Sequence, residues 1–567
     1  MARKIYNISS VGLRVKVYAI RTANLHPAPC TLHLKSAPCT LHSALLNNLS
    51  SLLTLLFFVL IPANAQMMGG FGMMPNVKPE YTAPLKVEGG MIKGQMIGDV
   101  EVYKGVPFAA PPVGELRWKA PQKVEKWSGV RDATQFAKSP IQGNVFPGGN
   151  SEDCLYLNIW TPAKRDGKKD LPVVVWIYGG GFMSGSTSFY DGTLFAKEGI
   201  IFVSIAYRVD KMGFLALPEL SAENSHGVSG NYGLLDQIEA LKWIQRNIGQ
   251  FGGDKKKVTI YGESAGGQSV SMLCASPLAK GLFRGAICSS GGSFSPAREK
   301  MYSGENVKSL ATEEKDGLEY ADHLGAHSLK ELRAMDASAF TTPWPERCAW
   351  PNIDGYVIPT DQFTLYEQGK YNDVAVLIGY NSDEGASFNP TNVPSQHIAD
   401  VIERYGEQWG KKLLAAYPIT DSGVPWTGRN LMRDVSFGWH IWSWARLQSR
   451  TGKSPVYYYF FDQHPDYPKE SPMYDHGSGH GADYPYVFRM MFPGRSSEED
   501  IKMSETMFRY WTNFIKTLNP NADGLPTWPT FNEATENVMI LSGTPHVGGV
   551  PDKASMEVLD GYFKSRR

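Results

Sequence analysis

Apolar residues along this chain follow two periods, and their order predicts the fold. Leu171 to Tyr178 (LPVVVWIY) and Ile200 to Ile205 (IIFVSI) are nearly continuous apolar runs, which are typical of strands covered by helices on both faces. Leu234 to Ile248 instead has an apolar residue every three or four positions, as in a helix that packs on a sheet. Strands that alternate with such helices predict a doubly wound α/β fold.

Further runs extend this sheet. Gly285 to Ser290 (GAICSS) and Val374 to Gly379 (VAVLIG) predict buried strands, and Gly89 to Val106 predicts short antiparallel strands that open the domain. Residues 295–345 are polar and helix-like, so we expect them to form part of a cap over the site. Because no linker or repeat divides the chain after residue 85, residues 85–567 are predicted to form one α/β domain, with a large mixed sheet flanked by helices.

The amino-terminal region has a different pattern. No Asp or Glu precedes Glu80, and Leu52 to Ile61 is an apolar run too short to span a bilayer. Ala63-Asn64-Ala65 follows it and has the small-x-small form of a cleavage site. Residues 1–65 are therefore predicted to be a signal peptide region of an exported, periplasmic or extracellular protein, and residues 66–84 a flexible lead-in. A transmembrane anchor is the alternative interpretation.

The polar stretch before this apolar run is unusually long. Ala-Pro-Cys-Thr-Leu-His occurs at 28–33 and again at 37–42. We expect translation to start after these first few dozen residues.

Charge and cysteine content give no indication of a nucleic-acid partner, an anionic membrane surface or a zinc site. Lys plus Arg and Asp plus Glu number 56 each, so the balance gives no support for a nucleic-acid partner or an anionic membrane surface. The cysteines after residue 65 do not have the spacing of a zinc site, although their even number permits disulfides. No metal or cofactor is expected, and the oligomeric state stays open. These cysteines are Cys154, Cys274, Cys288 and Cys348.

The strongest chemical signal is the stretch Val258 to Gly267 (VTIYGESAGG). A strand-like run enters Gly-x-Ser-x-Gly, and a helix-compatible run follows it, so the chain is predicted to reverse sharply at Ser264. Gly262 and Gly266 allow the helix to pass close to the strand. Ser264 is therefore a candidate nucleophile, and Glu263 is expected to support the site without reacting itself.

A glycine run follows the first buried strand. Gly179-Gly180-Gly181 is either a mobile turn or a place where bare backbone N–H groups face a substrate oxygen. In the second interpretation Gly180 and Gly181, together with the N–H of Ala265 beside the nucleophile, form an oxyanion hole.

A serine nucleophile needs a base and an orienting carboxylate, which follow the serine in chain order in α/β-hydrolases. Asp383 and Glu384 come directly after the VAVLIG strand, and His476 and His480 lie in a glycine-rich loop downstream. Order and location favour these candidates, but the residues alone leave open which carboxylate and which histidine act.

Several motifs in this order resemble the type-B carboxylesterase family, the cholinesterase-like branch of the α/β-hydrolases. The resemblance implies Ser264 as nucleophile, Glu384 as acid, His480 as base and Ser290 as a serine near the acid. The chain lacks the family's upstream partner for Cys154 and the tryptophan that stacks on choline in cholinesterases. The shared stretches are Ser151 to Asn158, Trp176 to Phe182, Gly230 to Gln237, Phe251 to Asp254, Gly262 to Gly266, Asn381 to Gly385 and His480 to Phe488.

The predicted function is hydrolysis of a small-molecule carboxylic ester through an acyl-enzyme. A non-catalytic binding module of the same fold and a serine peptidase are the alternatives. The sequence does not distinguish aromatic residues that line the acyl and alcohol pockets from residues of the core. The candidates are Phe182, Trp344, Trp350, Phe388 and the aromatics around Trp439.

Overall fold

The protein is described here by a computed structural model. The structure describes residues 79–164, 170–342, 348–388, 393–419, 424–465, 468–471, 474–494 and 496–567, and side chains of 424–427 are left out. The predicted signal region and Trp344 lie outside the described residues.

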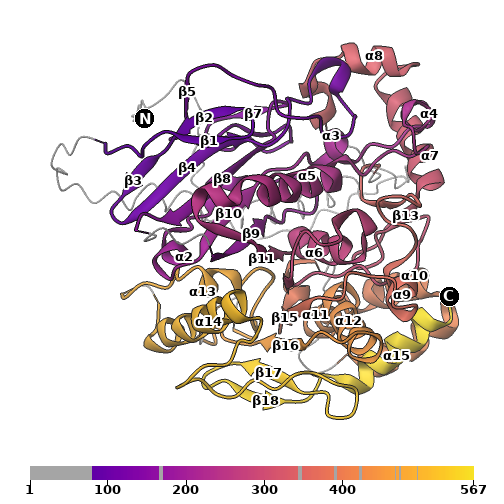
Figure 1. Cartoon of the computed structure of the whole chain (residues 1–567). Helices are drawn as coiled ribbons and strands as arrows, with labels where there is room; N and C mark the ends of the chain where they lie inside the picture. Colours follow the sequence, from indigo (N-terminus) through magenta and orange to yellow (C-terminus); the bar gives the residue numbers. More distant parts are fainter. Residues whose placement is uncertain are drawn as a thin grey trace, which may run out of the picture. The chain divides into compact units, whose positions relative to one another are not determined.

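A mixed β-sheet forms the centre of the described chain (Figure 1). Its strands β10, β9, β11, β12, β15, β16 and β17 are mutually parallel, and the strands at both edges are antiparallel. The strand order is β18 (His546–Gly548), β17 (Val538–Leu541), β16 (Val456–Phe461), β15 (Ala375–Asn381), β12 (Gly285–Ser289), β11 (Gly253–Glu263), β9 (Leu171–Ile177), β10 (Ile201–Ile205), β8 (Tyr156–Pro162), β4 (Val100–Pro107) and β3 (Gln95–Ile97).

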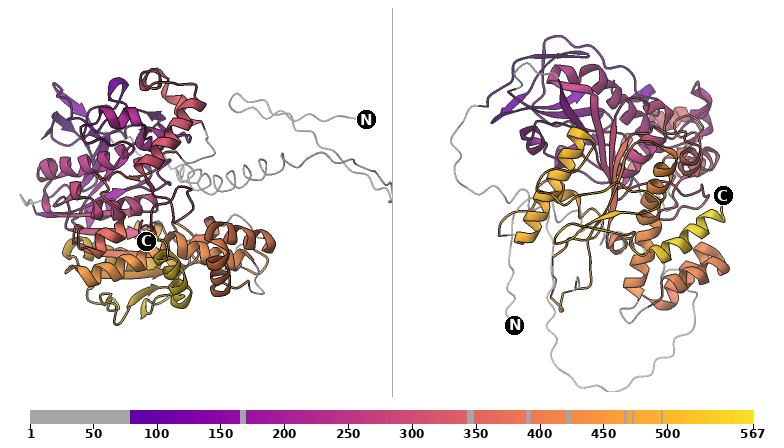
Figure 2. Two further views of the ribbon diagram at one scale, coloured as in Figure 1. Left: turned by 90° about the vertical axis from the view of Figure 1, so that its right-hand side faces the viewer. Right: turned by 60° about the horizontal axis from the view of Figure 1, so that its bottom comes forward.

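Both faces of this sheet are covered, which explains the continuous apolar runs. Along β9, Val173 and Val175 contribute to one apolar cluster, whereas Val174 and Trp176 contribute to another. The first cluster includes residues of α5, α6 and α12, and the second includes residues of α2, α13 and α14, so helices lie on both faces of the sheet (Figure 2). These helices are α2 (Thr193–Lys197), α5 (Tyr232–Asn247), α6 (Ala265–Ala275), α12 (Trp439–Thr451), α13 (Tyr484–Val487) and α14 (Glu498–Thr517).

The segment predicted as part of a cap contains helices from residue 310 onward. Side chains of α7 (Leu310–His323) and α8 (Leu329–Ala334) pack with those of α3 (Asp210–Phe214) and α4 (Pro218–Glu223) in a third apolar cluster. Residues 295–307 contain no helix.

Smaller elements complete the described chain. The other helices are α9 (Gln362–Glu367), α10 (Pro394–Ala416), α11 (Val424–Arg433) and α15 (Lys553–Lys564), and a π-helical turn, η7 (Asp434–Gly438), joins α11 to α12. Short sheets pair β1 (Leu85–Val87), β2 (Gly90–Lys93) and β5 (Val130–Asp132), then β6 (Ser139–Pro140) with β7 (Asn150–Ser151), and β13 (Lys308–Ser309) with β14 (Asn352–Ile353).

Two details bear on the sequence predictions. Pairing begins before residue 85, because Tyr81 bridges to Gln95 and Thr82 bonds to Gly94. The four cysteines of the described chain are buried and free, so none of them forms a disulfide.

Candidate active site

Ser264 occupies a sharp turn between β11, which ends at Glu263, and α6, which begins at Ala265. Its backbone has a positive φ of 59° with ψ of −125°, a conformation that non-glycine residues rarely adopt. A Cβ on Gly262 would lie 2.2 Å from the Gly266 carbonyl oxygen, and one on Gly266 would lie 2.0 Å from the Ile177 carbonyl oxygen. Glycine at both positions therefore allows the first turn of α6 to pack directly on β11 and β9.

The structure brings three of the predicted residues together. The Nε2 atom of His480 lies 2.7 Å from Ser264 Oγ, and its Nδ1 atom lies 2.6 Å from Glu384 Oε2. Ser264 follows β11, Glu384 follows β15, and His480 lies in the loop after β16. Because these strands run parallel in one sheet, their carboxyl ends meet at the same edge.

Glu384 is fully buried and its second oxygen is also engaged. The Ser290 hydroxyl and the Asn381 N–H, at 2.8 Å, both donate to Glu384 Oε1. Ser290, which directly follows β12, has a positive φ of 49°. These two donors hold the carboxylate so that Oε2 faces His480.

The competing candidates, Asp383 and His476, have contacts of their own, and no described contact joins either of them to the Ser264 hydroxyl. Asp383 contacts Arg429 at 3.0 Å, and the Nδ1 atom of His476 lies 3.7 Å from the Asp383 carboxylate. Burial raises the pKa of Asp383 to about 6, although Arg429 opposes that shift. Burial also lowers the pKa of His476. Asp383 and His476 thus form a separate group beside the site.

Glu263 is a third carboxylate close to His480. Its Oε1 atom lies 3.4 Å from His480 Nε2. Burial raises the pKa of Glu263 to about 8. Burial lowers the pKa of His480, but Glu384 first and Glu263 second outweigh it, and the net direction is upward.

Two aromatic rings contact His480. The Phe437 ring stacks on the imidazole with centroids 4.8 Å apart and 23° between the planes, and Phe388 meets it edge-on at 4.9 Å. Phe388 is 36% exposed, whereas Phe182, Trp350 and Trp439 are buried. Phe437 is one of the aromatics around Trp439, but the sequence does not indicate its contact with His480, because that contact depends on a π-helical turn that no periodicity predicts.

The glycine run lies beside the serine. A Cβ on Gly179 would lie 2.9 Å from Ser264 Cβ. Gly180 and Gly181 have φ of +100° and +64°, and the Gly180 carbonyl accepts from the N–H groups of Met183 and Ser184. Within the described part of the chain, nothing accepts a hydrogen bond from the N–H of Gly180 or Gly181. Ala265, as the first residue of α6, also lacks an intrahelical acceptor for its N–H.

The surroundings add two negative findings. No group of three or more His, Cys, Asp or Glu side chains within the described residues is arranged to hold a metal ion. Among the helices that the structure describes, none combines the length and the apolar character needed to cross a bilayer.

A mixed sheet with a serine at its strand-to-helix turn, close to an acid and a histidine from later strands, defines the class of α/β-hydrolases. Residues 82–558 match the model of the Carboxylesterase family, so the chain belongs to this family. It is a carboxylic ester hydrolase that acts on small-molecule esters.

Known relatives agree with this assignment. The chain is 36% identical over 475 residues to fumonisin B1 esterase of Sphingopyxis macrogoltabida, covering 79% of this chain and 84% of that protein. It is 32% identical over 510 residues to para-nitrobenzyl esterase of Bacillus subtilis (strain 168), covering 83% and 97%. A solved PNB esterase structure superposes with a TM-score of 0.72 at 31% identity, covering 84% of this chain and 99% of that one.

Proposed function

We propose that the protein hydrolyses esters through an acyl-enzyme formed on Ser264, with His480 as general base and Glu384 as the orienting acid. The observation that carries this proposal is the pair of contacts at the imidazole, 2.7 Å from Nε2 to the serine oxygen and 2.6 Å from Nδ1 to Glu384. This spacing supports proton transfer from the serine.

The reaction proceeds in two halves. His480 Nε2 accepts the Ser264 proton as Oγ attacks the ester carbonyl, and the imidazolium then donates that proton to the departing alkoxide. A water molecule then attacks the acyl-enzyme while His480 accepts its proton, and the imidazolium returns that proton to the Ser264 oxygen as the carboxylic acid leaves. Glu384 holds the proton on Nδ1 and stabilises the imidazolium that forms in each half.

The oxyanion of the tetrahedral intermediate is stabilised by the N–H groups of Gly180, Gly181 and Ala265. Their lack of protein acceptors within the described residues supports this role. A Cβ on Gly180 would lie 2.2 Å from the Ser184 carbonyl oxygen, so this loop conformation requires a residue without a side chain there. Losing one such donor typically costs about 100- to 1000-fold in rate.

Ser264→Ala tests the nucleophile. We expect kcat for p-nitrophenyl acetate to fall by at least about 10⁴-fold while the protein stays folded. A matched control is Ser295→Ala, since Ser295 is a buried serine whose hydroxyl has no hydrogen bond among the described residues. Unchanged turnover by Ser264→Ala would refute the assignment.

The same samples separate the alternatives. A fluorophosphonate probe should label the wild type at Ser264 and leave Ser264→Ala unlabelled. A binding module would show neither turnover nor labelling, whereas a serine peptidase would cleave a peptide anilide better than the matched ester.

Substrate identity is proposed only as a class. Relatives carry names such as fumonisin B1 esterase, cocaine esterase and para-nitrobenzyl esterase, which differ in their esters. We therefore expect a carboxylic ester, and a screen over alkanoyl, aromatic and sugar-acetyl esters would define the preferred acyl and alcohol groups.

Export is part of the proposal and depends on the sequence alone. The apolar run Leu52 to Ile61 and the Ala63-Asn64-Ala65 signature support a signal cut after Ala65. Amino-terminal sequencing of the exported protein should then begin at Gln66, and an amino terminus before residue 52 would contradict cleavage there.

A further inference from the structure

The imidazole of His480 lies against the ring of Phe437, which comes from the π-helical turn η7. We propose that Phe437 is a positioning residue that fixes the plane of the His480 imidazole between Glu384 and Ser264. This inference rests on the proposed function, since it assigns a task to a group that touches the base.

Two hydrogen bonds alone do not fix the ring. The contacts at Nδ1 and Nε2 define two points of the imidazole, and the ring can still swing about the line that joins them. A flat surface against one face removes this freedom. Phe437 provides such a surface, because it is stacked at 4.8 Å and only 4% exposed. Phe388, which meets the ring edge-on, is 36% exposed and therefore less constrained.

The π-helical turn is held by buried polar contacts. Asp434, the first residue of η7, pairs with Arg433 at 2.7 Å and accepts a hydrogen bond of 2.7 Å from the Tyr417 hydroxyl. A Cβ on Gly438, the last residue, would lie 2.9 Å from Asp434 Oδ1. Turns of this kind are rare and often occur at functional sites. Here the wide turn directs Phe437 toward His480.

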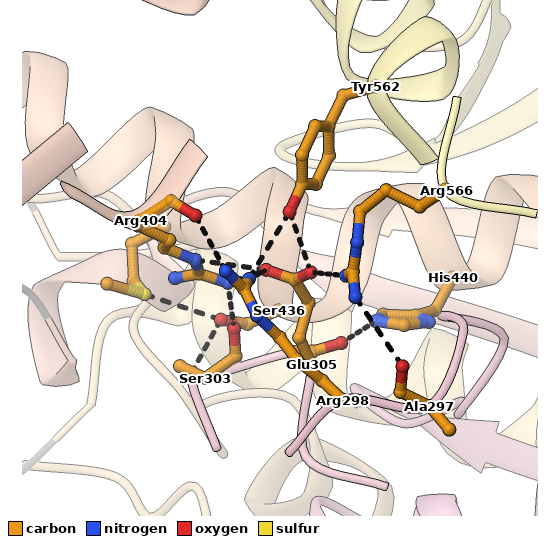
Figure 3. Close-up of polar contacts among 11 residues, drawn as sticks. Ala297, Arg298, Ser303, Glu305, Arg404, Ser436, His440, Tyr562 and Arg566 are labelled. Carbon is orange, nitrogen blue, oxygen red and sulfur yellow. Dashed lines mark hydrogen bonds and ion pairs between the residues drawn. The ribbon is translucent and has the colours of Figure 1, made fainter. Parts of the chain in front are cut away.

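A loop packs directly against this turn, and Figure 3 shows Ser303 of the loop beside Ser436 of the turn. A Cβ on Gly304 would lie 1.9 Å from the Val435 carbonyl oxygen, and the hydroxyls of Ser303 and Ser436 are 2.7 Å apart. His440 accepts from the Phe294 N–H at Nδ1, so its Nε2–H donates to the Gly304 carbonyl at 2.8 Å. The turn and the loop are therefore in backbone-to-backbone contact.

The loop is itself fixed by a buried carboxylate. Glu305 is fully buried and contacts the guanidinium groups of Arg298, Arg404 and Arg566 at 2.8, 3.0 and 2.6 Å (Figure 3). The Tyr562 hydroxyl donates to it as well, at 3.0 Å. These partners come from the loop, α10 and the carboxyl-terminal end of the chain. The turn that presents Phe437 is thus packed against a loop with several independent attachments.

The test compares variants that lose the ring with variants that keep it. Phe437→Leu and Phe437→Met remove the flat face but keep an apolar side chain, and Met keeps more of the volume. We expect kcat for p-nitrophenyl acetate to fall about 30- to 100-fold, with KM changed less than about three-fold, because a misplaced base slows the chemical step. Fluorophosphonate labelling of Ser264 should slow by a similar factor. Phe437→Tyr keeps the ring and should retain both rates within about three-fold.

Phe531→Leu is the matched control. Phe531 is 3% exposed and packs on Tyr458, away from His480, so the control reports the cost of removing a buried ring elsewhere. If Phe437→Leu and Phe437→Met match Phe531→Leu in kcat and labelling rate, or if Phe437→Tyr loses as much activity as they do, the positioning role is wrong. Failure of the wild type to react with the probe would instead refute the proposed function.

Discussion

Asp383 and Glu384 are neighbours in sequence, follow the same strand and are both buried, yet their surroundings differ. Asp383 contacts the Arg429 guanidinium at 3.0 Å and lies 3.7 Å from His476. Glu384 accepts from the neutral groups of Ser290 and Asn381 and from His480. Among the described residues, no Lys or Arg forms an ion pair with Glu384.

This difference indicates what a buried carboxylate contributes. A permanent cation already balances the charge of Asp383, so little remains to act on a nearby histidine. Glu384 contacts dipoles instead, and in the proposed mechanism its charge favours the positive charge that develops on His480 during reaction. In this proposal, two adjacent side chains with the same functional group have different roles, Asp383 a structural one and Glu384 a chemical one.

Replacing the two histidines should give the largest contrast. His480→Ala removes the only group within hydrogen-bond distance of the proposed nucleophile's oxygen among the described residues, and we expect kcat to fall on the order of 10⁴- to 10⁶-fold. His476→Ala leaves that contact intact and should keep kcat within about three-fold. Steady-state kinetics with p-nitrophenyl acetate measures both, and equal losses would remove the distinction between the two groups.

Replacing the two carboxylates should give a smaller difference in kcat, and it should also change the pH dependence of kcat/KM. Glu384→Gln should lower kcat by about 10³- to 10⁴-fold, since the amide neither holds the tautomer nor stabilises the imidazolium. Because the charge of Glu384 raises the pKa of His480, its loss lowers that pKa. The imidazole then stays neutral at lower pH, and the acid limb of the residual kcat/KM profile moves to lower pH.

Asp383→Asn is the matched control for this change. It should leave the acid limb in place and change kcat by less than about ten-fold, while it destabilises the fold by about 3–5 kcal/mol, because Arg429 loses its buried partner. Thermal or urea unfolding measures that loss. An acid limb that moves in Asp383→Asn but not in Glu384→Gln would reverse the two roles.

The sequence predicts the sheet better than it predicts this contrast. Runs such as Leu171 to Tyr178 are apolar because both faces of their strands are buried, so local pattern and structure agree. The turn at Ser264 is likewise encoded within a few residues, since Gly262 and Gly266 are required by close backbone contacts.

The choice between neighbours is not encoded locally. Asp383 and Glu384 share one short motif, and their partners Arg429 and Ser290 lie 46 and 94 positions away. The residues of this motif alone leave both carboxylates open, and only the family resemblance favours Glu384. The contact of Phe437 with His480 is not encoded locally either, because it needs a π-helical turn stabilised by distant side chains.

The smallest expected effect concerns the donors that hold Glu384. Ser290→Ala removes the hydroxyl that donates to Oε1 but leaves the Asn381 N–H at 2.8 Å on the same oxygen. A hydrogen bond to a charged group contributes about 1.5–3 kcal/mol, and the remaining donor keeps the carboxylate in place, so we expect kcat to fall only about ten-fold. Ser382→Ala is a matched control, since the Ser382 hydroxyl accepts from the Ser478 N–H and does not contact Glu384. If Ser290→Ala reduces kcat as strongly as Glu384→Gln, the orientation of this carboxylate depends on one hydroxyl. The difference from Asp383 would then come from a single side chain on β12's loop rather than from the absence of a cation.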